Sequence, residues 1–156
     1  MKVQFIRATA KDAERIWKMQ IESFSRLLDK YQDFDTNPAS EPIENVIWRL
    51  QQSNTYFYFI KVDENIVGGI RIIDDLKDNV RKRISPIFIL PQFQNQGIAQ
   101  KAIVKAEELH GSMIWELDTI LQEKGNCHLY EKMGYHQTGK TKVVNERMTL
   151  VGYQKG

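Results

Sequence analysis

The stretch ISPIFILPQFQNQGIAQKAIVKAEELHG, residues 84–111, decides which fold this chain can adopt. An apolar, β-rich segment up to Leu90 is followed by the polar run QNQ and Gly97, after which apolar residues recur at helical spacing. The first backbone N–H groups of such a helix have no acceptor within it, and the helix dipole makes this end positive. Because Gly97 and Ala99 leave little side chain over these groups, a bulky diphosphate can approach the backbone. The stretch therefore predicts a strand, an anion-binding loop and a helix.

Two better-known phosphate-binding motifs are absent from the chain. It contains neither G-x-x-x-x-G-K-[ST] nor a G-x-G-x-x-G run after a strand. A plainer interpretation of Gly97 is that it only permits a tight turn between strand and helix. Taken alone, this stretch leaves both interpretations open.

The rest of the chain alternates between segments with the period of strands and segments with the period of helices. Thr9 is suited to cap the first helix and Pro42 to begin the second. A helix between two strands of one sheet implies a parallel crossover. The order β-α-α-β-β-β-α-β-α-β-β predicts a mixed α/β sheet. The expected strands are 3–8, 55–62, 66–73, 82–90, 113–120, 135–143 and 147–154, and the later helices are 97–110 and 127–134.

Length and composition predict one domain over residues 1–156, long enough for one core and short for two. Charged residues make up 27% and the formal net charge is +2, without the basic excess of a nucleic-acid binder. The single cysteine and the absence of a signal-peptide pattern make a reducing cytoplasm the expected location. No apolar run is long enough for a membrane span.

Two motifs resemble the signatures of the GNAT superfamily of acyl-CoA-dependent N-acetyltransferases. In that family a strand and a proline precede Q/R-x-x-G-x-G/A at the start of a helix, and here Gln94, Gly97 and Ala99 fill this pattern. Downstream, NCHLYEKMGY resembles the second signature, an asparagine ahead of a helix that bears L-Y-x-x-x-G-F/Y. Asn126 and Tyr130 occupy its asparagine and tyrosine positions. Two such motifs in one chain are much more specific than one.

The resemblance implies a mixed, mostly antiparallel sheet with a central, splayed pair of parallel strands, flanked by about four helices. It also implies acetyl-CoA as cosubstrate, with its pyrophosphate on the backbone of residues 95–99 and its pantetheine arm between the splayed strands. Unpaired backbone groups of those strands would pair with the pantetheine amides. No metal is expected. The implied cofactor-binding residues are Phe88, Ile89, Gln94, Asn95, Gln96, Gly97, Ile98, Ala99, Asn126 and Tyr130.

The implied reaction is direct attack of a neutral amine on the thioester carbonyl. A backbone N–H near Phe88 or Ile89 would stabilise the oxyanion, and Tyr130 would protonate the departing thiolate. From the residues alone, a helix tyrosine beside Leu129 and near Met133, such as Tyr130, is usually a packing residue. Cys127 is interpreted as a small packed residue, because no catalytic histidine arrangement accompanies it.

The general base is the least defined part of this chemistry. Many family members carry a glutamate on the strand before the phosphate loop, but Arg83 occupies that position, and a guanidinium cannot act as a base at neutral pH. Glu116, Asp118 and His110 are the other candidates. Each also has an ordinary interpretation as a solvated group, and none is assigned as catalytic.

The expected acceptor is a small-molecule or peptide amine, with neither nucleic acid nor a membrane as partner and with a homodimer left open. The loop from Asp29 to Glu44 carries five acids against one lysine, which favours a cationic amine or is simply a solvated acidic loop. Tyr31 and Phe34 are candidates for binding the amine or for packing the loop. The main alternative is an acyl-CoA-binding sensor or adaptor that does not catalyse transfer. An interaction domain without a cofactor would leave the loop at 94–99 unexplained.

Overall fold

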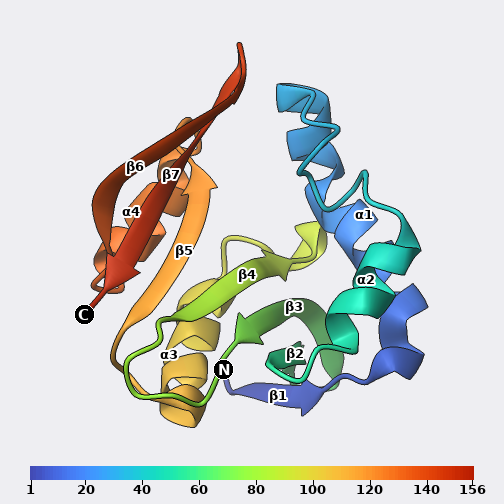
Figure 1. Ribbon diagram of the computed structural model, residues 1–156. Coiled ribbons are helices and arrows are strands. Elements are labelled where there is room, and N and C mark those ends of the chain that lie inside the picture. The colour runs from blue at the N-terminus through green and yellow to red at the C-terminus, as the bar shows by residue number, and fades with distance from the viewer.

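The computed structural model describes residues 1–156 as one seven-stranded sheet with α-helices on both faces (Figure 1). The strand order is β1-β2-β3-β4-β5-β7-β6. The strands are β1 (Val3–Arg7), β2 (Thr55–Val62), β3 (Asn65–Ile73), β4 (Lys82–Ile89), β5 (Trp115–Ile120), β6 (His136–Asn145) and β7 (Met148–Lys155). The helices are α1 (Ala13–Tyr31), α2 (Ile43–Leu50), α3 (Ile98–His110) and α4 (Lys124–Lys132).

All neighbouring strands run antiparallel except β4 and β5, which α3 connects as a parallel crossover. These two strands pair only where Lys82 faces Trp115 and Arg83 faces Glu116. Beyond these pairs β5 turns away from β4 (Figure 1), so the facing edges of both strands stay open. The predicted fold, a mostly antiparallel sheet with a central splayed parallel pair, is confirmed.

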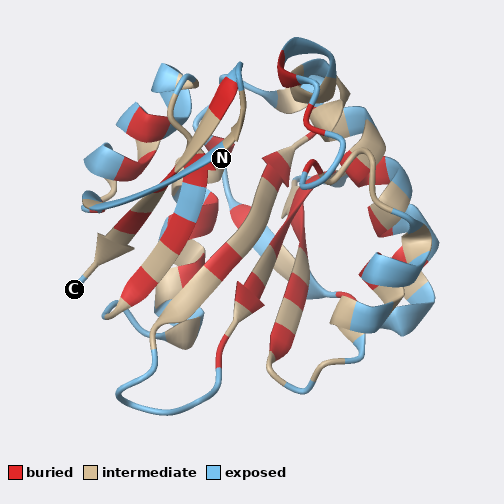
Figure 2. Cartoon of the chain, turned by 45° about the horizontal axis from the view of Figure 1, so that its top comes forward, coloured by how far each residue is buried: buried red, intermediate tan, exposed pale blue.

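The sheet separates two apolar cores because alternate residues of a strand point to opposite faces. On β2, Phe57 packs with α1 and α2, whereas Ile60 belongs to the core under α3 and α4. Figure 2 shows the buried residues along the strands and on the helix sides that face the sheet. None of the helices is both long and apolar enough to cross a membrane.

Two helix boundaries differ from the sequence prediction. α1 continues to Tyr31, past the expected start of the acidic loop, because the Tyr31 side chain is buried and anchors the last turn. α4 begins at Lys124 rather than at Cys127. Its extra turn contains the poor helix formers Gly125 and Asn126, and it forms because the N–H of Asn126 donates to the Glu123 carbonyl over 3.1 Å. Asn126 therefore lies in the first turn of α4 and not ahead of it.

Candidate active site

The splay between β4 and β5 opens into two adjoining cavities. The first, of about 360 Å³, lies between α1, the end of β4 and the N-terminal ends of α3 and α4, and is called the α3 cavity here. The second, of about 280 Å³, lies between the loop after α1, β4, β5 and β7, and is called the β5 cavity. Five residues line both cavities, so the two meet there: Phe24, Leu27, Ile87, Asn126 and Tyr130.

The segment before α3 presents free backbone N–H groups to the α3 cavity. Asn95 and Gly97 have positive φ angles of 62° and 77°, a backbone arrangement that turns successive N–H groups toward one side. The N–H groups from Asn95 to Gln100 find no acceptor within the protein. A Cβ atom added at Gly97 would meet nothing within 4 Å, so the space over these groups is open. An anion placed there would meet free donors and the positive end of α3.

The side chain of Gln94 does not add a donor to this loop. Its Nε2 instead donates to the Ile89 carbonyl at 2.9 Å. The carbonyl of Phe88 faces β3, where a Cβ added at Gly68 would lie only 2.1 Å from its oxygen. Because successive residues of a strand direct their backbone groups to opposite edges, the N–H of Ile89 faces the gap. Of the two predicted backbone partners, Ile89 is the one that the open edge of β4 presents.

Tyr130 and Asn126 lie at the meeting point of the cavities, on the side of α4 that faces the sheet. The Tyr130 ring is 7% exposed and packs edge-on against Tyr135, with 6.2 Å between the ring centroids. Burial, followed by an electrostatic contribution from Cys127, raises the pKa of Tyr130 to about 12. Its hydroxyl therefore stays protonated at neutral pH. Packing and proton donation are compatible roles for this one residue.

The structure separates the remaining catalytic candidates. His110 is bound by the Asp74 carboxylate and the Tyr58 hydroxyl, each at 2.8 Å, and lines neither cavity. Cys127 is buried, with its Sγ 3.7 Å from the Ile120 carbonyl. No group of three or more His, Cys, Asp or Glu side chains is arranged to hold a metal ion. His110 is thus a structural group, and Cys127 is packed as predicted.

Arg83 forms ion pairs with both acidic candidates of β5. Its guanidinium lies 2.6 Å from Asp118 and 3.7 Å from Glu116. Arg83 and Asp118 line the β5 cavity, whereas Glu116 does not. The position that the resemblance gives to a glutamate therefore holds a cation whose charge is compensated within the protein.

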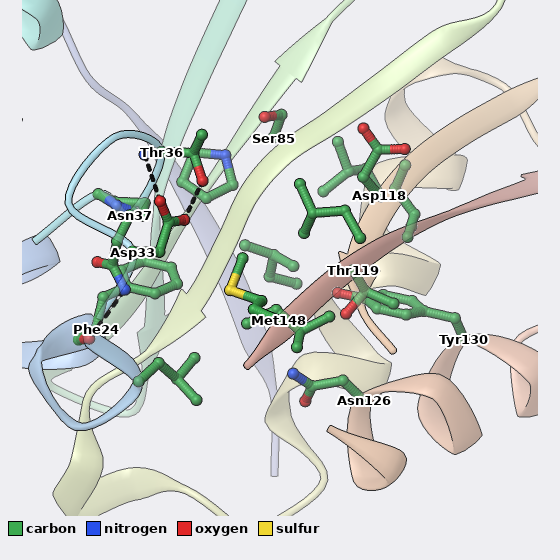
Figure 3. Close-up of a pocket in the computed structure, with 18 of the residues that line it drawn as sticks. Phe24, Asp33, Thr36, Asn37, Ser85, Asp118, Thr119, Asn126, Tyr130 and Met148 are labelled. Carbon is green, nitrogen blue, oxygen red and sulfur yellow. Dashed lines mark hydrogen bonds between the residues drawn. The ribbon is translucent and has the colours of Figure 1, made fainter. Parts of the chain in front are cut away.

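The acidic loop contributes one buried carboxylate to the β5 cavity. Asp33 is 3% exposed, and its oxygens accept the Thr36 hydroxyl and the backbone N–H groups of Asp35 and Thr36. No lysine, arginine or histidine forms an ion pair with it. Figure 3 shows it on the wall opposite Tyr130.

The other residues of this loop lie elsewhere. Glu41 pairs with Arg49 at 2.5 Å, and Asp29, Asp35 and Glu44 are exposed. Phe34 is exposed as well and lines neither cavity, while Tyr31 donates to Glu123 at 2.5 Å. Sequence reasoning treated the loop as one charged surface, and it missed the apolar residues Phe24, Leu27 and Ile87 at the meeting point. Their helical and strand spacing marks them only as ordinary packing residues.

The family model described as "Acetyltransferase (GNAT) family" matches residues 14–135, which is most of the chain. The chain therefore belongs to the GNAT family of acetyltransferases, and the resemblance seen in its two motifs is confirmed. No curated protein matches it in sequence.

Solved acetyltransferase structures share the fold over nearly the whole chain. An acetyltransferase from Thermus thermophilus is 15% identical, with a TM-score of 0.74 over 99% of this chain and 97% of that one. Spermidine N-acetyltransferase from Vibrio cholerae, in complex with CoA and spermine, is 15% identical, with a TM-score of 0.74 over 97% and 94%. The microcin C7 self-immunity acetyltransferase MccE, in complex with acetyl-CoA and AMP, is 18% identical, with a TM-score of 0.70 over 99% and 92%. At these identities the likeness concerns the fold.

Proposed function

We propose that this protein is an N-acetyltransferase that moves the acetyl group of acetyl-CoA to a primary amine of a small molecule or peptide. The observation that carries the proposal is the junction of two cavities at Tyr130 and Asn126. One cavity holds free N–H donors at a helix start, and the other holds a buried carboxylate without an ion pair. A thioester at the junction would lie between CoA in the α3 cavity and an amine in the β5 cavity.

Acetyl-CoA suits the α3 cavity by the chemistry of its parts. Its pyrophosphate is an anion, and the free N–H groups from Asn95 to Gln100 supply donors for it. Its pantetheine arm carries amides, for which the open edge of β4 at Ile89 and the side chain of Asn126 are suitable partners. The thioester sulfur would then lie near the Tyr130 hydroxyl.

The reaction is a direct transfer. The amine nitrogen forms a bond to the thioester carbon, the Ile89 N–H stabilises the oxyanion, and the C–S bond then breaks. Tyr130 gives its proton to the leaving thiolate, and the proton lost by the amine nitrogen restores the hydroxyl through water. Arg83 takes no proton in this scheme, since its guanidinium stays charged.

The β5 cavity suits a cationic amine as the acceptor. Asp33 places a hydrogen-bonded carboxylate without an ion pair in the β5 cavity, and a second ammonium of the substrate would pair with it while a neutral amine attacks. Spermidine N-acetyltransferase, whose structure contains CoA and spermine, shares this fold. We place the enzyme in a reducing cytoplasm, as a single domain over residues 1–156.

The test is CoA binding and thiol release with a matched pair of glycine variants. Gly97→Glu places bulk and negative charge where the pyrophosphate should lie. Gly139→Glu is the control, because Gly139 also has a positive φ, of 87°, and open space around it, yet it lies in β6 outside both cavities. We expect calorimetry to find CoA binding abolished in Gly97→Glu and kept in Gly139→Glu. We also expect the wild type to release thiol from acetyl-CoA when a suitable amine of a test panel is added. Unchanged CoA affinity in a folded Gly97→Glu protein would contradict the proposal.

A sensor or adaptor that binds acyl-CoA without transfer is the second candidate, favoured by Arg83 in the place of a glutamate. It predicts that CoA raises the melting temperature while no amine of the panel releases thiol. Any amine-dependent thiol release that Gly97→Glu abolishes excludes it.

A further inference from the structure

The loop that would bind the pyrophosphate has no positive side chain of its own. From Gln94 to Gln100 it contains neither lysine nor arginine. The helix dipole supplies only a partial positive charge, whereas a pyrophosphate diester carries two negative charges. The loop by itself therefore does not neutralise the two negative charges of a pyrophosphate.

One cation reaches the same cavity from a different element. Arg26 of α1 lines the α3 cavity together with Gly97 and Ala99, and it is the only basic side chain among the lining residues. Glu123 is the only acidic one. The one positively charged side chain of the α3 cavity therefore comes from α1.

The present partner of Arg26 can release it at little cost. The Arg26 side chain is 70% exposed, and its Nη2 lies 3.4 Å from the Glu123 carboxylate. That carboxylate has closer partners in Lys30 at 2.8 Å and the Tyr31 hydroxyl at 2.5 Å. Burial alone would raise the pKa of Glu123, but its partners Lys30, Tyr31 and Arg26 together lower it. Of these partners, Lys30 and Tyr31 lie at the shorter distances. Glu123 therefore stays compensated after Arg26 has left it.

We propose that Arg26 binds the pyrophosphate of CoA, supplying from α1 the positive charge that the loop before α3 lacks. This inference rests on the proposed function, because it assumes that CoA occupies the α3 cavity. A guanidinium is suited to the role, since its planar fork of donors matches two phosphate oxygens at once. On binding, Arg26 exchanges the long contact with Glu123 for a charge-assisted pair with the ligand.

The experiment measures three affinities by calorimetry: for CoA, for dephospho-CoA, which keeps the pyrophosphate, and for pantetheine, which has no phosphate. In Arg26→Ala we expect CoA and dephospho-CoA to bind about tenfold more weakly, with pantetheine unchanged. The salt dependence of CoA binding should also be shallower than in the wild type. Lys30→Ala is the control, because Lys30 makes the shorter bond to Glu123 but does not line the cavity.

Each outcome has one meaning. If Arg26→Ala binds CoA like the wild type, or loses pantetheine affinity to the same extent, the inference is wrong. A loss on CoA but not on dephospho-CoA would move the contact to the 3′-phosphate and contradict the pyrophosphate assignment. If Lys30→Ala weakens CoA at least as much, Arg26 acts only through the contact between α1 and Glu123. A wild type that binds none of the three ligands overturns the proposed function itself.

Discussion

The hydroxyl of Tyr130 lies where the two cavities meet, and its removal separates catalysis from packing. In Tyr130→Phe the buried ring keeps its contacts, so we expect CoA affinity to remain while kcat falls by about 10²-fold. Burial raises the pKa of Tyr130 to about 12, so its ionisation should not reduce the wild-type kcat between about pH 7 and pH 9. Steady-state kinetics at saturating acetyl-CoA measure both effects.

The control for this change is Tyr135→Phe. Tyr135 packs against Tyr130, lines neither cavity, and its buried hydroxyl has no hydrogen-bond partner. Its loss should leave kcat unchanged. A Tyr130→Phe enzyme within about twofold of the wild type, with chemistry rate-limiting, would show that water protonates the thiolate.

Asp33 offers the second prediction at this scale. Asp33→Asn keeps the size of the side chain and an oxygen that accepts the N–H groups of the loop, but it removes the charge from the β5 cavity. We expect kcat/KM for a cationic amine to fall about tenfold. Asp35→Asn removes the same charge from an exposed position of the same loop and should change little. Equal effects of the two substitutions would mean that the loop acts only by its overall charge.

At the scale of elements, the contact between β3 and β4 positions the open edge of β4. A Cβ atom at Gly68 would lie 2.1 Å from the Phe88 carbonyl oxygen, and a backbone atom cannot move aside as a flexible side chain can. Gly68→Ala should therefore lower the free energy of unfolding by about 3 kcal/mol. Urea denaturation followed by circular dichroism gives this value.

The matched substitution is Gly125→Ala. Gly125 lies in the first turn of α4 and has nothing within 4 Å of an added Cβ. Alanine there should be neutral or stabilise the fold by up to about 1 kcal/mol, because it has the higher helix propensity. If Gly68→Ala proved as harmless as Gly125→Ala, β4 would not be held as tightly against β3 as the contact implies.

For the molecule as a whole, the sheet consists of one part made of β1 to β4 and another made of β5 to β7, and these parts join through only a short backbone pairing between β4 and β5. A cofactor in the gap would contact both parts, so it should stabilise the entire fold. At a CoA concentration of 100 times Kd, the free energy of unfolding should rise by about 2.7 kcal/mol. Amide hydrogen exchange should slow most at Ile89 and from Asn95 to Gln100, with β1 as an internal reference. Stabilisation without slower exchange at these amides would place the ligand elsewhere.

The sequence by itself determined most of the fold, because its signals are local. Strand and helix periods, the glycine before α3 and the two family motifs depend on neighbours along the chain. Local propensity was least reliable at helix ends. Gly125 and Asn126 argue against a helix, yet backbone bonds to Glu123 extend α4 over them. Likewise, burial of Tyr31 extends α1 into the expected loop.

Only the tertiary structure decided which polar groups share a site, because they come from distant parts of the chain. It selected Asp33 from the acids of its loop, since Asp33 is buried in the β5 cavity without an ion pair, whereas Glu41 pairs with Arg49 and the other three acids are exposed. It held His110 against Asp74 and Tyr58 and thereby removed it from the candidates for a base. It brought Arg26 of α1 to the loop before α3, a pairing that no spacing in the sequence indicates. Packing of α1 across the open end of the sheet creates that proximity, and such packing depends on the whole fold.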